Sequence, residues 1–300
     1  MQIGLGLDSR LGLSTRQLLE LGSLASELRF DSIWTNAGVD YDPIGLCVAW
    51  NQRTGLPTGV SVVPITRNPP AVLALAARTA VELSGGRFML GIGSGSVTDR
   101  PIAAVREYIA AVRKGAPDVP LCVGALGPQM LRLASRQAEA AALNWCTPEQ
   151  ILWSREQVGP RIQLVMYIRV CVDDDVAAAR RTLAQQILAY ALLVRPTGAR
   201  GYRAHFERMG FGRELATLEE MQAKGASQGA LIGAMSDRFI DAFGYAGDGI
   251  TARERVAELA QGLDVAIVRV LSARPGDEVP VHRAIAALAP AQSSLRSTAV

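Results

Sequence analysis

The feature of this sequence that most restricts its fold is a regular alternation of short apolar runs with amphipathic helical segments. The apolar runs that predict strands are residues 2–7, 31–34, 59–63, 88–92, 121–124, 142–144, 163–172 and 264–271. Strands that alternate with helices form parallel sheets, because each helix crosses over to the next strand. Eight such units in 300 residues favour an α/β fold, a closed (β/α)8 or TIM barrel, over the alternative of an open Rossmann-like sheet.

Residue patterns at the helix starts support this alternation. Ser14 and Gln17 stand at the spacing of a capping box, in which each side chain bonds the other residue's backbone amide. Asp42 followed by Pro43 predicts another start, because proline has no amide hydrogen to lose in the first helical turn. We therefore expect a single domain over residues 1–300.

One segment interrupts the alternation. Residues 173–248 contain no convincing strand, and helical patterns fill the stretches 176–193, 202–209 and 229–243. We expect a helical insertion of about residues 174–248 between the seventh and eighth strands, which would form a lid, an oligomer interface or simple packing.

Composition and charge exclude several classes of protein. The net charge is +3, with 31 basic and 28 acidic residues and no basic stripe, which argues against a nucleic-acid partner. No run of 18 apolar residues predicts a membrane span, and the N-terminal segment has no signal-peptide pattern, so we expect a cytoplasmic protein. The 4 cysteines lack a CxxC pair and are expected to be buried reduced thiols.

The sequence also disfavours several kinds of catalytic site. The 2 histidines, His205 and His282, both lie away from the predicted strand ends, which argues against a Ser-His-Asp triad or a histidine zinc site. Cys146 has no histidine obviously near it, so we expect a structural cysteine. The glycine run at 91–95 fails the GxGxxG pattern in both frames. The aspartates at 173–175 are expected to cap a helix, and no metal site is predicted.

Four segments resemble a known family. The strand-four segment VELSGGRFMLGIGSG at 81–95 closely resembles the signature of luciferase-like monooxygenases and of deazaflavin-dependent oxidoreductases in the same superfamily. The segments at 63–70, 123–131 and 143–149 look like further parts of the same pattern, in the same order. The resemblance spans all eight predicted strands and favours the deazaflavin, coenzyme F420-dependent branch.

The resemblance implies a flavin-type cofactor at the barrel mouth, namely coenzyme F420, with FMN as the alternative. Gly91, Gly93 and Gly95 would let a flat ring approach the backbone. The helix that opens at Gly127 and Pro128 would bind the cofactor phosphate. A non-proline cis peptide is implied at residues 60–61, give or take one residue. The implied cofactor contacts are Val60, Ser61, Val62, Gly93, Ser94, Asp99, Ala125, Leu126, Gly127, Pro128, Gln129, Asn144 and Trp145.

The chain departs from its relatives where they place acid and base groups. Ala37 and Gly38 stand where several relatives have Asp-His, and Ser96 replaces a glutamate. Alcohol oxidation needs a base for the hydroxyl proton and is therefore disfavoured. We expect an F420H2-dependent reductase that transfers hydride to an activated C=C or C=N bond, as in natural-product pathways, with Asn36, Ser96, Asp40 or water supplying the proton.

Two alternatives to this reductase remain open, an FMN-dependent luciferase-like monooxygenase and a non-catalytic flavin-binding protein. From the resemblance we also expect a homodimer that acts on a small-molecule substrate.

Overall fold

The strands of the computed structural model, which describes residues 1–193 and 201–290, form one parallel sheet that closes on itself. The strands are β1 Gln2–Gly6, β2 Ser32–Thr35, β3 Thr58–Pro64, β4 Phe88–Gly93, β5 Leu121–Gly124, β6 Ala140–Asn144, β7 Gln163–Val172, β8 Gly244–Gly247 and β9 Val265–Leu271. Strands β1 to β7 pair in sequence order, and β9 joins β7 to β1. The predicted (β/α)8 barrel is confirmed, with β9 as its eighth strand.

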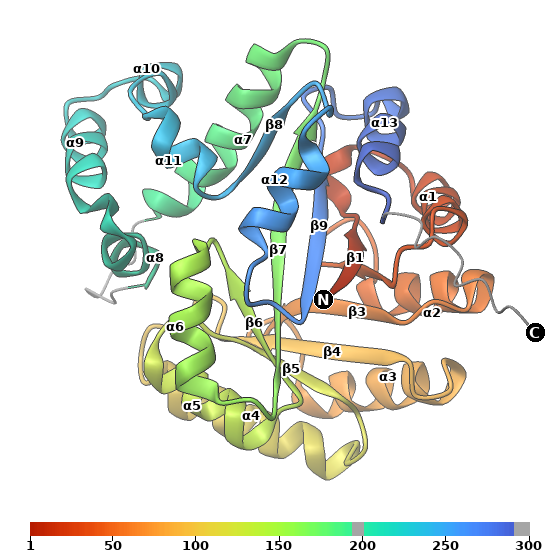
Figure 1. Cartoon of the computed structure of the whole chain (residues 1–300). Helices are drawn as coiled ribbons and strands as arrows, with labels where there is room; N and C mark the ends of the chain where they lie inside the picture. The colour runs from red at the N-terminus through yellow and green to blue at the C-terminus, as the bar shows by residue number, and fades with distance from the viewer. Residues whose placement is uncertain (194–200, 291–300) are drawn as a thin grey trace, which may run out of the picture.

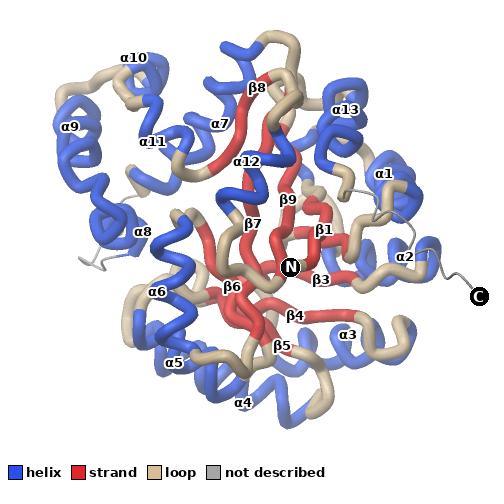
Figure 2. Tube along the Cα trace, viewed as in Figure 1, coloured by secondary structure: helices blue, strands red, loops and turns tan. Residues whose placement is uncertain are grey.

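Helices surround this barrel (Figure 2). They are α1 Thr15–Glu27, α2 Pro43–Thr54, α3 Pro70–Leu83, α4 Pro101–Gly115, α5 Pro128–Gln137, α6 Pro148–Val158, α7 Val176–Ala191, α8 Gly201–Phe206, α9 Gly212–Ala223, α10 Gln228–Gly233, α11 Asp237–Asp241, α12 Ala252–Leu259 and α13 Glu278–Leu288. The capping box of α1 is present, since the Gln17 amide donates to Ser14 Oγ over 3.3 Å and the Ser14 amide donates to Gln17 Oε1 over 2.8 Å. Asp42 caps α2 and Asp175 caps α7, as predicted.

Strand β7 is longer than its neighbour β6 and pairs with two strands along the same edge. Its first half pairs with β6, up to Asn144 opposite Tyr167. Its last residues pair with β8, from Arg169 opposite Gly244 to Val172 opposite Gly247. Strand β8 thus occupies the edge that β6 leaves open, and it connects the insertion to the rim of the barrel.

Strand β8 corrects the prediction that residues 173–248 contain no strand. Its four residues, GYAG, are too short to show a periodic pattern, and only the free edge of β7 makes them a strand. The predicted helix at 229–243 is two short helices, α10 and α11. The helix is interrupted because Ser236 starts a new one: its Oγ caps α11 by accepting from the Phe239 amide over 3.1 Å.

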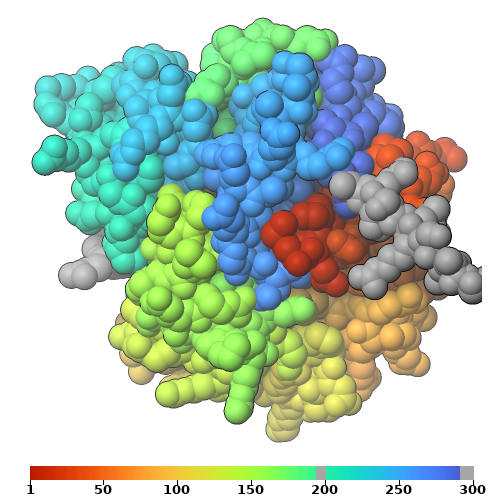
Figure 3. All heavy atoms as spheres, viewed as in Figure 1, coloured from red at the N-terminus to blue at the C-terminus, as the bar shows by residue number. Residues whose placement is uncertain are grey.

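The insertion has a small core of its own. Helices α8 to α11 gather on the opposite side of the barrel from α1 and α13 (Figure 1) and project from it as a lobe (Figure 3). Four buried phenylalanines lie at the centre of this lobe. The ring centres of Phe206 and Phe243, which meet edge to face, are 5.0 Å apart, and those of the stacked Phe211 and Phe239 are 4.7 Å apart. Trp145, just after β6, belongs to the same cluster. Among the described residues, none of the helices is both long and apolar enough to cross a membrane.

Alternation along the strands decides which residues fill the inside of the barrel. Val165 and Tyr167 of β7 and Val265 and Ile267 of β9 form one buried cluster with Trp34 of β2. The next residues in these two series are Arg169 and Arg269, and both are buried. The interior of the barrel therefore ends in two arginines at the carboxyl ends of its strands.

Candidate active site

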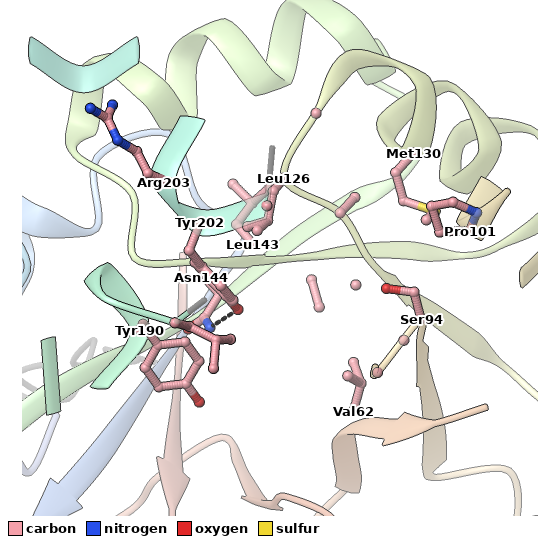
Figure 4. A pocket seen from close by; sticks show the side chains of 18 of the residues that line it. Val62, Ser94, Pro101, Leu126, Met130, Leu143, Asn144, Tyr190, Tyr202 and Arg203 are labelled. Atoms are coloured by element: carbon pink, nitrogen blue, oxygen red, sulfur yellow. Dashed lines mark hydrogen bonds between the residues drawn. The ribbon is translucent and has the colours of Figure 1, made fainter. Parts of the chain in front are cut away.

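A cavity of about 1680 Å³ opens at the carboxyl ends of the barrel strands. The ends of β3 to β7 and β9, the start of α5, and residues of α7 and α8 line it (Figure 4). The volume exceeds the range of about 300–1,000 Å³ that is usual for one small ligand. The cavity can therefore hold a large cofactor together with a substrate.

A bulge in β3 forms one wall of this cavity. The Ser61–Val62 peptide is cis, one residue beyond the position that the family resemblance implies and within the one-residue range given for it. The pairing of β3 with β4 shifts between Val60 and Val63. Ser61 and Val62 consequently line the cavity, whereas Val60 is fully buried behind them.

The strand-four glycines make room for this bulge, which corrects the prediction that they clear space for a cofactor ring. A Cβ on Gly91 would lie 2.2 Å from the Val60 carbonyl oxygen, and one on Gly93 would lie 2.6 Å from Val62 Cγ2. Protein atoms therefore occupy the space above both residues. Gly93 still lines the cavity, but Val62 forms the surface that a flat ring would meet.

The start of α5 provides a site for an anion. Gly127 is the N-cap residue of this helix, makes no side-chain cap, and lines the cavity together with Pro128 and Gln129. The first amides of a helix lack partners within the helix and carry the positive end of its dipole. A Cβ at Gly127 would meet nothing within 4 Å. The cavity thus has free amides and open space at the position predicted for the cofactor phosphate.

The predicted site residues fall into two groups. Those that line the cavity are Asn36, Ser61, Val62, Gly93, Ser94, Ala125, Leu126, Gly127, Pro128, Gln129 and Asn144. Ser96 and Asp99 are exposed and stand outside the lining, as does the exposed Asp40, while Val60 and Trp145 are buried behind it. Of the three residues named as proton-donor candidates, Asn36, Ser96 and Asp40, the structure brings only Asn36 to the cavity.

Asn144 links the end of β6 to the insertion and to the barrel interior. Its Nδ2 donates to the Tyr202 hydroxyl over 2.6 Å, and its Oδ1 accepts from Arg169 Nη1 over 2.5 Å. The Arg169 guanidinium carbon lies 3.7 Å from the centre of the Trp145 ring. Trp145 therefore supports Arg169 from behind and does not face the cavity.

Four lining residues that the sequence analysis did not select are Arg10, Arg169, Arg269 and Tyr190. A signal for two of them was present, since Arg169 and Arg269 are lone charges near the ends of two otherwise apolar strands. A charged residue in a strand whose other residues are apolar is rarely buried without a polar partner, so it marks a candidate functional position. Tyr190 lies on α7, and only the folded insertion brings it to the barrel.

The charges around Tyr190 change its acidity. In Figure 4 its ring lies across the open centre of the cavity from Val62. Burial raises the pKa of the phenol, but Arg169, Arg269 and Arg10 outweigh burial and hold that pKa below its ordinary value. Tyr190 is therefore a better proton donor than a free tyrosine.

A histidine lies next to Cys146, contrary to the prediction. His205 Nε2 lies 3.6 Å from Cys146 Sγ and 2.9 Å from the Trp145 carbonyl oxygen. Because a carbonyl only accepts, Nε2 carries the hydrogen, and Nδ1 accepts from Arg208 Nη2 over 3.1 Å. Burial raises the pKa of Cys146 to about 12. Both groups are neutral at pH 7, so this pair is not an activated nucleophile.

Protonation of His205 is expected to destabilise the fold. Burial and the neighbouring Arg208 lower its pKa to about 4 from 6.5. The unfolded chain therefore binds a proton first as the pH falls, and stability is lost between pH 6.5 and pH 4. The expected loss is about 3 kcal/mol of unfolding free energy. Urea unfolding of the wild type and of His205→Gln across this range measures it, since glutamine keeps an amide donor without titrating. Parallel pH profiles for the two proteins would show that the histidine is not responsible.

Comparison with known proteins gives a family and several relatives. The model of the family described as luciferase-like monooxygenase matches residues 2–116 and 97–265 of this chain. A 5,10-methylenetetrahydromethanopterin reductase from Methanolobus tindarius is 26% identical over 308 aligned residues, which cover 86% of this chain and 90% of the relative.

Two solved structures share the fold at low sequence identity. The coenzyme F420-dependent tetrahydromethanopterin reductase from Methanopyrus kandleri is 18% identical with a TM-score of 0.73, over 96% of this chain and 97% of that one. The oxygenating constituent of 3,6-diketocamphane monooxygenase from Pseudomonas putida, in complex with FMN, is 15% identical with a TM-score of 0.60, over 97% and 98% of the two chains.

Proposed function

This chain belongs to the luciferase-like monooxygenase family, and from that membership we propose that it is an oxidoreductase that binds coenzyme F420 and reduces a small organic substrate. The observation that carries the proposal is one cavity that combines the Val62 bulge wall with the open N-terminus of α5. A tricyclic ring needs such a flat apolar surface, and a phosphate needs such free amides. The relative from Methanolobus tindarius, a reductase, supports the direction of the reaction.

The residues of the chain hold the cofactor and move the proton in this proposal. F420, when bound, supplies a hydride carrier at C5 of its deazaflavin ring. Gly127 and Gln129, on either side of Pro128, would bind its phosphate through their backbone amides, and Val62 would support the ring. Tyr190 donates the proton that accompanies hydride transfer to an activated C=C or C=N bond. A reduction requires an acid, and the cavity provides one in Tyr190 where Ala37, Gly38 and Ser96 provide no strong base.

An FMN-dependent monooxygenase is the second candidate, and one observation favours it. The Pseudomonas putida structure, which contains FMN, has the same barrel. Both cofactors carry a phosphate and a flat ring, so the shape of the cavity alone does not separate them. The homodimer and the cytoplasmic location expected from the sequence remain part of the proposal.

Titration of the protein with oxidised F420 and, in parallel, with FMN tests the cofactor. We expect tryptophan fluorescence to be quenched with a dissociation constant at least tenfold lower for F420 than for FMN. Trp145 lies behind the cavity in contact with Arg169, so binding there should change its emission. Tighter binding of FMN would assign the chain to the monooxygenases, and binding of neither would overturn the cofactor proposal.

A further inference from the structure

Two arginines end the apolar interior of the barrel, and they are more deeply buried than charged residues normally are. Arg169 of β7 is 1% exposed and Arg269 of β9 is 2% exposed. Both line the cavity, as does Arg10, which follows β1. Because β7, β9 and β1 are consecutive around the barrel, the three arginines form one group. We call Arg10, Arg169 and Arg269 the arginine cluster.

The arginine cluster carries more positive charge than its neighbours compensate. Arg269 pairs with the carboxylate of Asp8. Within residues 1–193 and 201–290, Arg169 meets no carboxylate; it bonds the Asn144 side chain and the Tyr167 carbonyl and stacks on Trp145. Arg10 bonds the neutral side chain of Gln186 over 3.0 Å. One aspartate therefore faces three cations.

The cluster also has hydrogen-bond donors left over. Among the described residues, the Nε atoms of Arg169 and Arg269 are buried without an acceptor. A buried polar group that lacks a hydrogen-bond partner destabilises the fold, and an unpaired buried charge destabilises it more. Burial lowers the pKa of Arg169 to about 10, with Arg269 adding to the effect, so it is still a cation at pH 7. An anion in the cavity beside these guanidinium groups would offset their uncompensated charge.

The position of the cluster separates it from the proposed phosphate site. Gly127 follows β5, which lies four strands from β1 in either direction around the eight-stranded barrel. Arg10 therefore lies on the opposite side of the barrel from the start of α5, and Arg269 and Arg169 lie three and two strands from β5. A cofactor phosphate at Gly127 leaves the cluster free for a second ligand.

We propose that the arginine cluster binds a carboxylate of the substrate and so selects anionic substrates, unsaturated carboxylic acids in particular. A guanidinium presents two parallel donors that match the two oxygens of a carboxylate. Tyr190 lies against the same cations and would meet the same end of the substrate. The substrate class deepens the proposed function, although binding of the carboxylate does not itself require F420.

Matched pairs of probes that differ only in charge test this inference. Calorimetry would compare cinnamate with cinnamamide and crotonate with crotonamide, on the cofactor-free protein and on its F420 complex. We expect each acid to bind at least tenfold more tightly than its amide. Equal affinities within both pairs would overturn the inference, and so would tighter binding of inorganic phosphate than of either acid.

Substitutions assign the preference to the cluster. Arg169→Met should abolish the preference for the acids, because methionine fills similar space without charge, and such replacements of buried ions are often tolerated. Arg10→Met, at an exposed position, should weaken acid binding about threefold without risk to the fold. The matched control is Arg203→Met, since Arg203 lines the cavity but already pairs with Glu207 and Glu219. Loss of the preference in the control alone would overturn the assignment.

These outcomes distinguish the proposed F420 cofactor from the proposed carboxylate site. If neither F420 nor FMN binds but Arg169→Met removes a clear preference for the acids, the carboxylate site stands and the proposed cofactor does not. If F420 binds tightly and the acids show no preference over the amides, the cofactor stands and the carboxylate site does not. If Arg169→Met weakens the binding of F420 as much as it weakens the binding of the acids, the cluster belongs to the cofactor site and the inference is overturned.

Discussion

Replacing Gly127 by aspartate should weaken F420 binding by about 100-fold or more while the protein stays folded. The new carboxylate would stand at the N-cap of α5, where the cofactor phosphate is proposed to bind. Two like charges placed side by side cost several kcal/mol of binding free energy. A 100-fold loss corresponds to about 2.7 kcal/mol. The backbone tolerates the change, because the residue has φ −119° and its Cβ would lie in open space.

The effect on stability should go in the opposite direction to the effect on binding. Aspartate is a favoured N-cap residue and Gly127 makes no side-chain cap, so the variant should unfold at the same or a slightly higher temperature. Gly127→Asn is the matched control, because asparagine has the same shape and caps helices without a charge. Fluorescence titration of both variants measures their F420 affinity, and thermal unfolding measures their stability. Unchanged F420 affinity in the aspartate variant would move the phosphate to another part of the cavity.

Replacing Tyr190 by phenylalanine should lower kcat by about 100-fold, the size expected for loss of a proton donor. The wild-type rate should fall as the pH rises through the pKa of Tyr190, because only the protonated phenol donates. That pKa lies below the ordinary value of 10.0. The variant should have lost this decline at high pH. Oxidation of F420H2 by an acceptor that the protein reduces, followed across the pH range, provides the measurement.

Tyr202→Phe separates a chemical role from a structural one. Tyr202 also lines the cavity, but its hydroxyl accepts a hydrogen bond from Asn144 Nδ2 over 2.6 Å. Loss of the Tyr202 hydroxyl should lower kcat less than Tyr190→Phe does, and it should leave the decline of the rate at high pH in place. F420 affinity should be unchanged in Tyr190→Phe. A Tyr190→Phe protein with full kcat and an unaltered pH profile would exclude this residue as the donor.

The barrel could be predicted because its information is local. Eight apolar runs separated by helix-start patterns such as Ser14–Gln17 leave few arrangements, and the crossover rule then fixes the order of the strands. The α5 start could be predicted for the same reason, since Gly127 and Pro128 are adjacent in the sequence. The strand-four glycines were located correctly but explained wrongly, because their neighbours, Val60 and Val62, belong to another strand.

The insertion could not be predicted in the same way, because its effects depend on contacts between distant residues. Strand β8 exists only because β7 extends past β6 and leaves an edge free. His205 meets Cys146 across 59 positions of sequence. Tyr190 becomes more acidic only because arginines from β7, β9 and the segment after β1 converge on it.

The sequence by itself determined the barrel and the family, because short apolar runs, helix-start patterns and the strand-four motif are local in the sequence. The tertiary structure alone decided which charged side chains line the cavity. Alternation along β7 and β9 points Arg169 and Arg269 inward, where both are buried, and closure of the barrel brings the exposed Arg10 to the same cavity. Charge and burial of this kind depend on all the surrounding groups at once, so they arise only after the chain has folded.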